Sequence, residues 1–151
     1  MNDNIFFSPF NAILNDIKST SGKYCEDVTR TVRRESSTIT VGVHKIGSSV
    51  PVVKQTMCTT NTADIESSVA QCKIVHDHGA SLARLTVQGN REAKACQGIR
   101  DALDAQNCDV ALVADIHFTP KVALKVAESF DKIRVNPGNF ADGFKKFDEK
   151  V

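Results

Sequence analysis

Four short apolar runs recur from Pro51 onward, roughly 20–30 residues apart, which is the length of one strand-plus-helix unit. Each run is rich in strand-forming residues, and a helical pattern separates it from the next. A strict alternation of strand and helix predicts an α/β fold with a parallel sheet. The four runs are residues 52–57, 82–87, 110–116 and 132–136.

The segments between these runs carry helical patterns, in which apolar side chains recur so that they share one helix face. Gly79 stands where the first helix is expected to end. Thr119 followed by Pro120 is typical of the N-cap and first position of a third, short helix. The apolar positions are Ile65, Val69, Cys72 and Val75, then Ala95, Ile99, Ala102 and Leu103, then Val122, Ala123, Val126 and Ala127.

Two parallel architectures compete for this pattern. A doubly wound sheet normally carries a glycine-rich turn after its first strand, but residues 57–62 contain no glycine. A barrel places its chemistry at the C-terminal ends of the strands, where the unusual residues of this chain lie. A whole barrel needs roughly 250 residues. We therefore predict the N-terminal part of a TIM (β/α)8 barrel with about four βα units, preceded by a short β-hairpin with a strand at 38–43 and a turn at 47–49.

Composition separates residues 1–23 from the rest of the chain, and it argues against nucleic-acid binding and a membrane span. Residues 1–23 are rich in Asn, Ser and Asp without a periodic apolar face; we predict a poorly ordered extension or leader remnant there, and a partial-barrel substrate-binding domain over 24–151. The chain carries 19 Lys and Arg against 18 Asp and Glu, which argues against a broad cationic face for nucleic acid. No run approaches the ~18 apolar residues of a membrane span.

The five cysteines are odd in number and contain no CxxC pair. This spacing indicates neither a disulfide framework nor a zinc site, so we predict no metal ligands. Buried thiols are expected, because free cysteine behaves as a small hydrophobe. Cys58 is the exception, because it follows a predicted strand and could face a pocket.

Two arginines lie inside predicted strands, Arg84 in the second run and Arg134 in the fourth. A cation cannot be buried there without a partner. Two interpretations stay open. The guanidinium groups pair with an inward carboxylate such as Asp115, or they point into the barrel mouth and hold an anion, since arginine binds phosphate oxygens in bidentate fashion.

Asp115 and His117 are two residues apart at the end of the third run, which places both side chains on one face of the strand. A carboxylate beside an imidazole favours a cationic hydrogen-bond donor or general acid; a histidine satisfied by a loop carbonyl is the alternative. Asn136 opens the turn-forming residues 136–139. The loop 59–62 either caps the next helix or presents amide N–H groups to phosphate.

Longer motifs stand in one order along the chain. They are Tyr-Cys-Glu-Asp at 24–27, Lys-Gln-Thr-Met at 54–57, Arg-Leu-Thr-Val-Gln-Gly at 84–89, Leu-Val-Ala-Asp-Ile-His-Phe at 112–118 and Ile-Arg-Val-Asn-Pro-Gly-Asn-Phe-Ala-Asp at 133–142. On these motifs the chain resembles the N-terminal part of the 4-hydroxy-3-methylbut-2-enyl diphosphate synthase family, in the longer form of plants, apicomplexans and some bacteria. The resemblance implies an oxidoreductase of the methylerythritol phosphate route to isoprenoids. Its substrate is 2-C-methyl-D-erythritol 2,4-cyclodiphosphate, which it opens by two-electron reduction.

The resemblance also implies site residues. Arg84, His117 and Arg134 match the family's diphosphate-binding residues, and Asp115 and Asn136 match positions that line the same mouth. The catalytic residues are expected beyond residue 151. The family carries a [4Fe-4S] cluster, whose ligands match nothing in this chain, and takes its electrons from ferredoxin or flavodoxin.

For the chain as a whole, the resemblance implies that the family's insert and C-terminal iron–sulfur domains are absent and that the isolated chain is inactive. It further implies a homodimer for the full-length form. The expected location is the plastid stroma in a plant, alga or apicomplexan, or otherwise the bacterial cytoplasm. Two alternatives remain: another phosphate-binding barrel enzyme similar to the pterin-dependent synthases, or a non-catalytic fragment.

Overall fold

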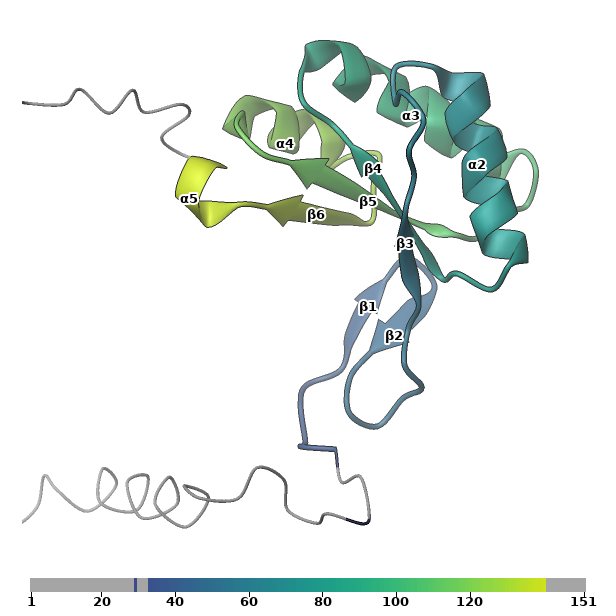
Figure 1. Cartoon of the computed structure of the whole chain (residues 1–151), viewed down its shortest axis with the longest axis vertical. Helices are drawn as coiled ribbons and strands as arrows, with labels where there is room; N and C mark the ends of the chain where they lie inside the picture. Colours follow the sequence, from purple (N-terminus) through teal and green to yellow (C-terminus); the bar gives the residue numbers. More distant parts are fainter. Residues whose placement is uncertain (1–28, 30–32, 141–151) are drawn as a thin grey trace, which may run out of the picture. The chain divides into compact units, whose positions relative to one another are not determined.

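A parallel sheet of four strands lies at the centre of the structure (Figure 1). The computed structural model describes Thr29 and residues 33–140, and the predicted extension at 1–23 lies outside them. The chain divides into two units at Glu35 and Ser36, and every described strand and helix belongs to the second unit. In sheet order the strands are β3 (Gln55–Met57), β4 (Leu82–Thr86), β5 (Ala111–Ile116) and β6 (Lys132–Val135). Each predicted run contains one of them, so the parallel α/β fold is confirmed.

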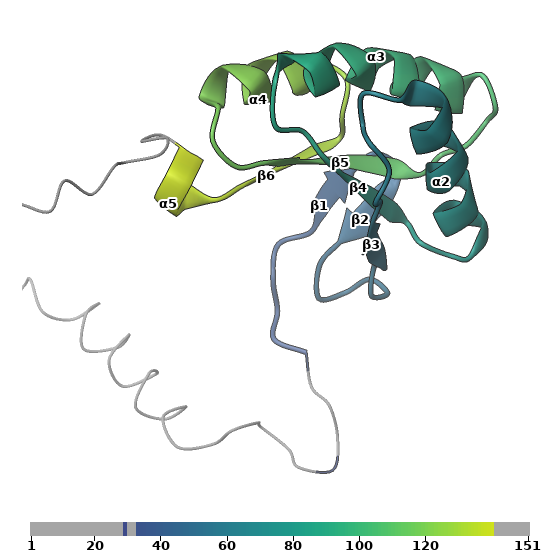
Figure 2. The same cartoon turned by 45° about the horizontal axis from the view of Figure 1, so that its top comes forward.

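Three helices cover one face of this sheet (Figure 2). They are α2 (Ile65–Asp77), α3 (Asn90–Asp104) and α4 (Pro120–Val126); a single further turn, α5 (Pro137–Phe140), follows β6. Gly79 follows the C-cap residue of α2 and has a φ of +86°, a conformation that favours glycine. The first helix therefore ends where predicted. Thr119 is the N-cap of α4, with Pro120 as the first helical residue, although the Thr119 hydroxyl makes no capping hydrogen bond.

Strand order decides between the two parallel architectures. The order β3-β4-β5-β6 follows the chain without reversal, and neighbouring strands pair in parallel. A doubly wound sheet would reverse its order and carry helices on both faces. Sequential strands with all long helices on one side are the geometry of a partial (β/α)8 barrel. Among the described residues the sheet is open, with β3 and β6 at its edges.

The two faces of the sheet hold separate cores. On the helix side, Leu85, Leu112 and Ile116 are fully buried against the three helices. On the opposite face, the smaller cluster consists of Val41, Leu82, Ala111 and Val113, with Ile46 and Val53 packed against it. Alternation along each strand produces this division, because successive side chains point to opposite faces.

A hairpin contributes to the smaller cluster on the sheet face opposite the helices, which we call the inner face. Its turn differs from the prediction. Its strands are β1 (Ile39–Val41) and β2 (His44–Ile46), so the chain reverses at Gly42 and Val43 rather than at residues 47–49. Gly42 has a φ of +58°, which a side chain would disfavour. A Cβ at Gly42 would also lie 3.1 Å from Cβ of Ala111. The turn therefore packs directly on the sheet, and a glycine is needed there.

Asp131 connects three parts of the fold. Its Oδ2 accepts a 2.7 Å hydrogen bond from the backbone N–H of Leu112, at the start of β5, and it is also paired with the Arg100 guanidinium of α3. Arg100 donates in addition to the carbonyl of Ser129, at 3.2 Å. One carboxylate thus ties β5 and α3 to the segment that leads into β6.

We expect Asp131→Ala to lower the free energy of unfolding by about 2–3 kcal/mol, because the buried Leu112 N–H and the Arg100 guanidinium lose their acceptor. Urea unfolding at neutral pH measures this. Glu128→Ala, at an exposed position nearby, serves as the matched control and should stay within about 0.5 kcal/mol of wild type. Equal stability of Asp131→Ala and the control would contradict the assignment.

Candidate functional site

The C-terminal ends of the strands bring Arg84, Asp115 and Arg134 together on the inner face. Asp115 of β5 is paired in register with Arg134 of β6 and with Thr86 of β4, so the Arg84 side chain lies one step along the same face. The neighbours Ala83 and Leu85 point the other way, into the helix-side core. Two cations on separate strands therefore flank one carboxylate.

Asp115 is the most enclosed member of this group, with a side chain only 1% exposed. Arg84 donates from Nη2 to its Oδ2, and Arg134 donates from Nη1 to its Oδ1 at 3.0 Å. Burial on its own would raise the pKa of Asp115, but the hydrogen bonds from Arg84 and Arg134 and the positive charge of Arg84 outweigh burial and hold the pKa below the usual aspartate range. The carboxylate is therefore ionised at neutral pH.

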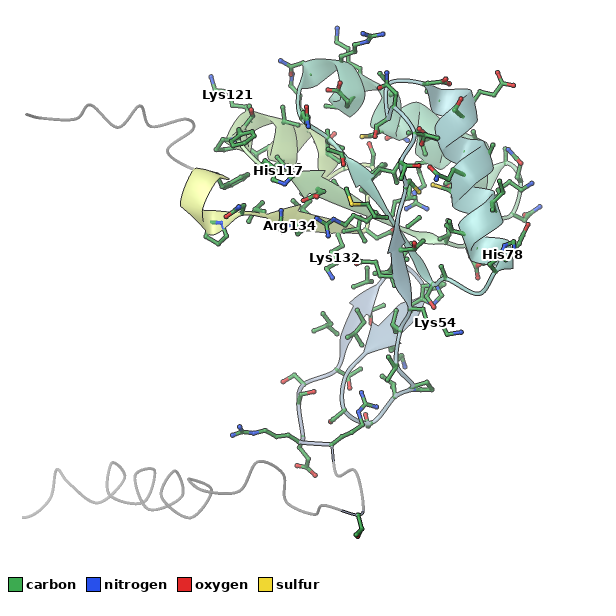
Figure 3. All side chains as sticks on the ribbon, in the orientation of Figure 1. Lys54, His78, His117, Lys121, Lys132 and Arg134 are labelled. Carbon is green, nitrogen blue, oxygen red and sulfur yellow. The ribbon has the colours of Figure 1, made fainter. Side chains whose placement is uncertain are left out.

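His117 completes the cluster at the end of β5 (Figure 3). Its Nε2 lies 3.2 Å from Nη1 of Arg134 and 3.9 Å from Oδ2 of Asp115. Since a guanidinium only donates, a hydrogen bond between these two requires Nε2 of the ring to accept, with the ring proton on Nδ1. The side chain is 29% exposed and thus reachable from the open side of the sheet.

Asn136 takes a different role from the other four predicted residues. Its Oδ1 accepts from the backbone N–H of Gly138 at 3.2 Å, and its carbonyl accepts from Phe140 at 2.9 Å. Both contacts shape the start of the α5 turn. Among the described contacts, none joins Asn136 to the arginines, Asp115 or His117. The structure therefore brings together four of the five predicted residues.

Lys132 is an inner-face cation that the sequence reasoning missed. It precedes Arg134 by two residues on β6, so both side chains project from the same face of that strand (Figure 3). Its register partner is Val113, a member of the inner cluster. Period-two spacing from Arg134 is the signal that could have identified it. With Lys132 included, three cations of the described part of the chain lie on the sheet face that carries Asp115.

Comparison with known proteins identifies the family. Residues 36–151 match the GcpE TIM-barrel domain. The chain belongs to this family. The match sets aside the alternative of a pterin-dependent synthase. The predicted domain start at residue 24 precedes the matched range and stays a prediction.

Several curated relatives carry the name of one enzyme. The chain is 52% identical over 126 residues to a chloroplastic 4-hydroxy-3-methylbut-2-en-1-yl diphosphate synthase (ferredoxin) of Arabidopsis thaliana and 50% identical over 127 residues to its namesake in Oryza sativa subsp. japonica. It is 41% identical over 129 residues to the flavodoxin form from Protochlamydia amoebophila. These matches cover 83–85% of this chain but only 17–20% of the relatives. The chain thus spans about a fifth of the length of these synthases.

The loop 59–62 after β3 was expected either to cap the next helix or to present amide N–H groups to a phosphate. In this GcpE-type domain its contacts are different. Asp64, rather than residues 59–62, caps α2 by accepting from Ser67 N at 3.1 Å. The N–H groups of Thr59 and Thr60 donate to Oε1 of Gln71, at 2.9 and 3.0 Å. These amides are therefore occupied within the domain and are not presented to a phosphate.

Cys58 also departs from its expected place. It is 5% exposed and belongs to the helix-side core, so the expectation that it faces a pocket is wrong. Strand alternation is the physical reason, because Met57 before it points to the inner face and is 45% exposed. The expectation of buried thiols holds for all four described cysteines: Cys58, Cys72, Cys96 and Cys108.

We expect Asp115→Asn to lower the free energy of unfolding by about 1–3 kcal/mol at pH 7, since it removes the common counterion of two arginines. The folded-state pKa of Asp115 lies below its unfolded value. Its stabilising contribution is thus complete above about pH 4 and is lost as the pH falls through the folded pKa. The deficit of Asp115→Asn against wild type should therefore shrink as the pH is lowered from 7 toward 3.

Urea unfolding across this pH range measures the effect. Asp77→Asn, at an exposed position on α2, is the matched control and should show a small, nearly pH-independent change. A deficit for Asp115→Asn that stays constant or grows on acidification would contradict the role assigned to its charge.

Proposed function

We propose that this chain forms part of the substrate diphosphate site of a 4-hydroxy-3-methylbut-2-enyl diphosphate synthase. Family membership and the names of the relatives support this assignment. The observation that carries it is the cluster of Arg84, Asp115 and Arg134 at the C-terminal ends of adjacent strands. In (β/α)8 barrels this end holds the active site.

The charge balance of the inner face favours an anionic ligand. Arg84, Arg134 and Lys132 carry three positive charges against the one negative charge of Asp115. Asp115 therefore neutralises only part of the charge and fixes the guanidinium groups in place. Nε of Arg84 is buried without a hydrogen-bond partner among the described residues, and Nη1 of Arg134 makes the contacts with both Asp115 and His117. A diphosphate offers the oxygen acceptors that such forked donors bind.

The role of each residue in the proposed site follows from these contacts. Arg84 and Arg134 bind phosphate oxygens through N–H groups that do not contact Asp115. Asp115 is a positioning residue, since it lies beneath both guanidinium groups and is itself buried. His117 lies beside Arg134 and contributes a polar ring to the same mouth. Asn136 shapes the turn that borders it.

In the proposed reaction of the full-length enzyme, 2-C-methyl-D-erythritol 2,4-cyclodiphosphate takes up two electrons and two protons, its ring opens, and one oxygen leaves as water. Ferredoxin or flavodoxin supplies the electrons, in keeping with the names of the relatives. The described residues do not fit an iron–sulfur cluster. Within Thr29 and 33–140, no three His, Cys, Asp or Glu side chains are placed to hold a metal ion. We therefore place the [4Fe-4S] cluster and its ligands on other parts of the enzyme.

The same proposal covers the setting of the full-length protein. A homodimer is proposed for it, in the plastid stroma for a plant, algal or apicomplexan source or in the cytoplasm for a bacterial one. Chloroplastic and bacterial relatives support these two settings. None of the helices among the described residues has the length and apolar character required to cross a bilayer.

We expect the folded 151-residue chain to bind inorganic pyrophosphate, and Arg84→Ala and Arg134→Ala each to weaken binding about ten- to hundredfold, through loss of charge-assisted hydrogen bonds. Isothermal titration calorimetry at low ionic strength measures the affinity. Arg91→Ala removes the same charge from an exposed site on α3 and should change the affinity less than about twofold. Unchanged affinity in both site variants, with circular dichroism spectra like wild type, would refute the proposed site; so would absence of binding to the wild-type chain.

We further expect the isolated chain to bind the cyclic diphosphate without converting it, because the proposal places electron delivery outside the described residues. Incubation with this substrate and dithionite, followed by chromatography of the products, tests this. A full-length synthase serves as the positive control. Formation of 4-hydroxy-3-methylbut-2-enyl diphosphate by the isolated chain would disprove its proposed inactivity.

A further inference from the structure

Two cysteine sulfurs meet on the helix side of the sheet, away from the proposed anion site. Sγ of Cys58, directly after β3, lies 3.9 Å from Sγ of Cys72 in the middle of α2. Among the cysteines that the structure describes, this is the one pair in contact. We propose that Cys58 and Cys72 form a reversible thiol–disulfide pair that links the end of β3 to α2. The proposal does not depend on the diphosphate site.

The two thiols differ in a way that assigns their roles. Cys58 is 5% exposed and Cys72 is fully buried, so an oxidant reaches Cys58 first when the loop opens locally. The hydrogen bond from Cys72 lowers the pKa of Cys58 below the usual thiol range, against the opposing effect of burial. The same contact and burial raise the pKa of Cys72. Cys58 is thus the attacking thiol and Cys72 the resolving thiol.

The surroundings allow the sulfurs to approach. A disulfide requires a sulfur separation of about 2.05 Å, so one or both side chains must move inward from van der Waals contact. Cys58 borders the loop 59–62, which α2 already holds through Gln71, the neighbour of Cys72. The loop and the helix are therefore in position before any bond forms. By contrast, burial raises the pKa of Cys96 to about 12, and its Sγ contacts the Glu92 carbonyl instead of a thiol.

The oxidant in the proposed step is a small disulfide, such as oxidised glutathione. The Cys58 thiolate attacks one of its sulfurs, forming a mixed disulfide and releasing one glutathione thiolate. Cys72 then gives up its proton and attacks Sγ of Cys58, which releases the second glutathione. The protein loses two electrons and two protons, and the oxidant gains both. Excess reduced thiol reverses the exchange.

Trypsin makes the pair easy to test, because cleavage after Lys54 and Lys73 leaves both cysteines in the single peptide 55–73, while Cys25, Cys96 and Cys108 each fall in a different peptide. The folded chain is treated with oxidised glutathione, denatured, alkylated with N-ethylmaleimide and digested. Mass spectrometry should then find peptide 55–73 without alkylation and lighter by two hydrogen atoms. The peptides that contain the buried Cys96 and Cys108 should be alkylated.

Variants separate the two roles. Cys72→Ala should retain glutathione on Cys58, because no resolving thiol remains, whereas Cys58→Ala should leave Cys72 free to be alkylated. Cys96→Ala and Cys108→Ala are matched controls that should not prevent the disulfide. Oxidation of the urea-unfolded chain should give mixed pairings, since the fold no longer selects the partners.

Two results would overturn the proposal, and neither requires a variant to fold. One is a doubly alkylated peptide 55–73 from the folded, oxidised wild-type chain. The other is a disulfide from Cys58 or Cys72 to Cys25, Cys96 or Cys108 as the main product. Because the anion site uses other residues, either result leaves the pyrophosphate measurements unaffected, and failure of pyrophosphate binding leaves the thiol measurements unaffected.

Discussion

The inner face of this domain depends on one buried carboxylate. Removing an ionised aspartate from water costs several kcal/mol unless charged partners compensate, and here Arg84 and Arg134 come from the strands on either side of Asp115. The three strands can keep this arrangement only in one register, because a slip of one residue would turn a charged side chain into the helix-side core. The ion cluster thus favours the strand register as well as the position of the guanidinium groups.

Strand alternation separates the chemistry of the two faces. Side chains of one parity on β4 and β5 join the apolar core under the helices, whereas those of the other parity reach the inner face. On the inner face, the side chains change from apolar to charged along the strands. Apolar Leu82 and Ala111 lie at the hairpin end, and Asp115 and Arg134 lie at the C-terminal end. Between these two levels, Val113 is in register with Arg84 and Lys132.

Much of this could be predicted from the sequence, because strand and helix periodicity are local properties. The four strands and the three helices follow from spacing alone, and pairing of Arg84 and Arg134 with Asp115 was one of two interpretations that the sequence left open. The position of the hairpin turn could not be predicted from local sequence, because Gly42 is required by its close approach to Ala111, which lies far away in the sequence. The role of the loop 59–62 could not be predicted for a similar reason, since the N–H groups of Thr59 and Thr60 donate to Gln71 of the following helix. Asn136 is a residue type that favours turns, and in the structure its side chain accepts a hydrogen bond from Gly138 within the α5 turn.

The geometry shows the pairing of both arginines with Asp115 and leaves this pairing compatible with the proposed anion binding. Pairing with Asp115 and binding an anion were alternatives for an isolated strand, but a guanidinium has five N–H donors and a carboxylate engages only some of them. Asp115 holds each arginine by one nitrogen, and the arginines remain 25% and 40% exposed. In the proposed anion site, the structural ion pair would fix two flexible side chains before a ligand arrives and so reduce the entropy lost on binding.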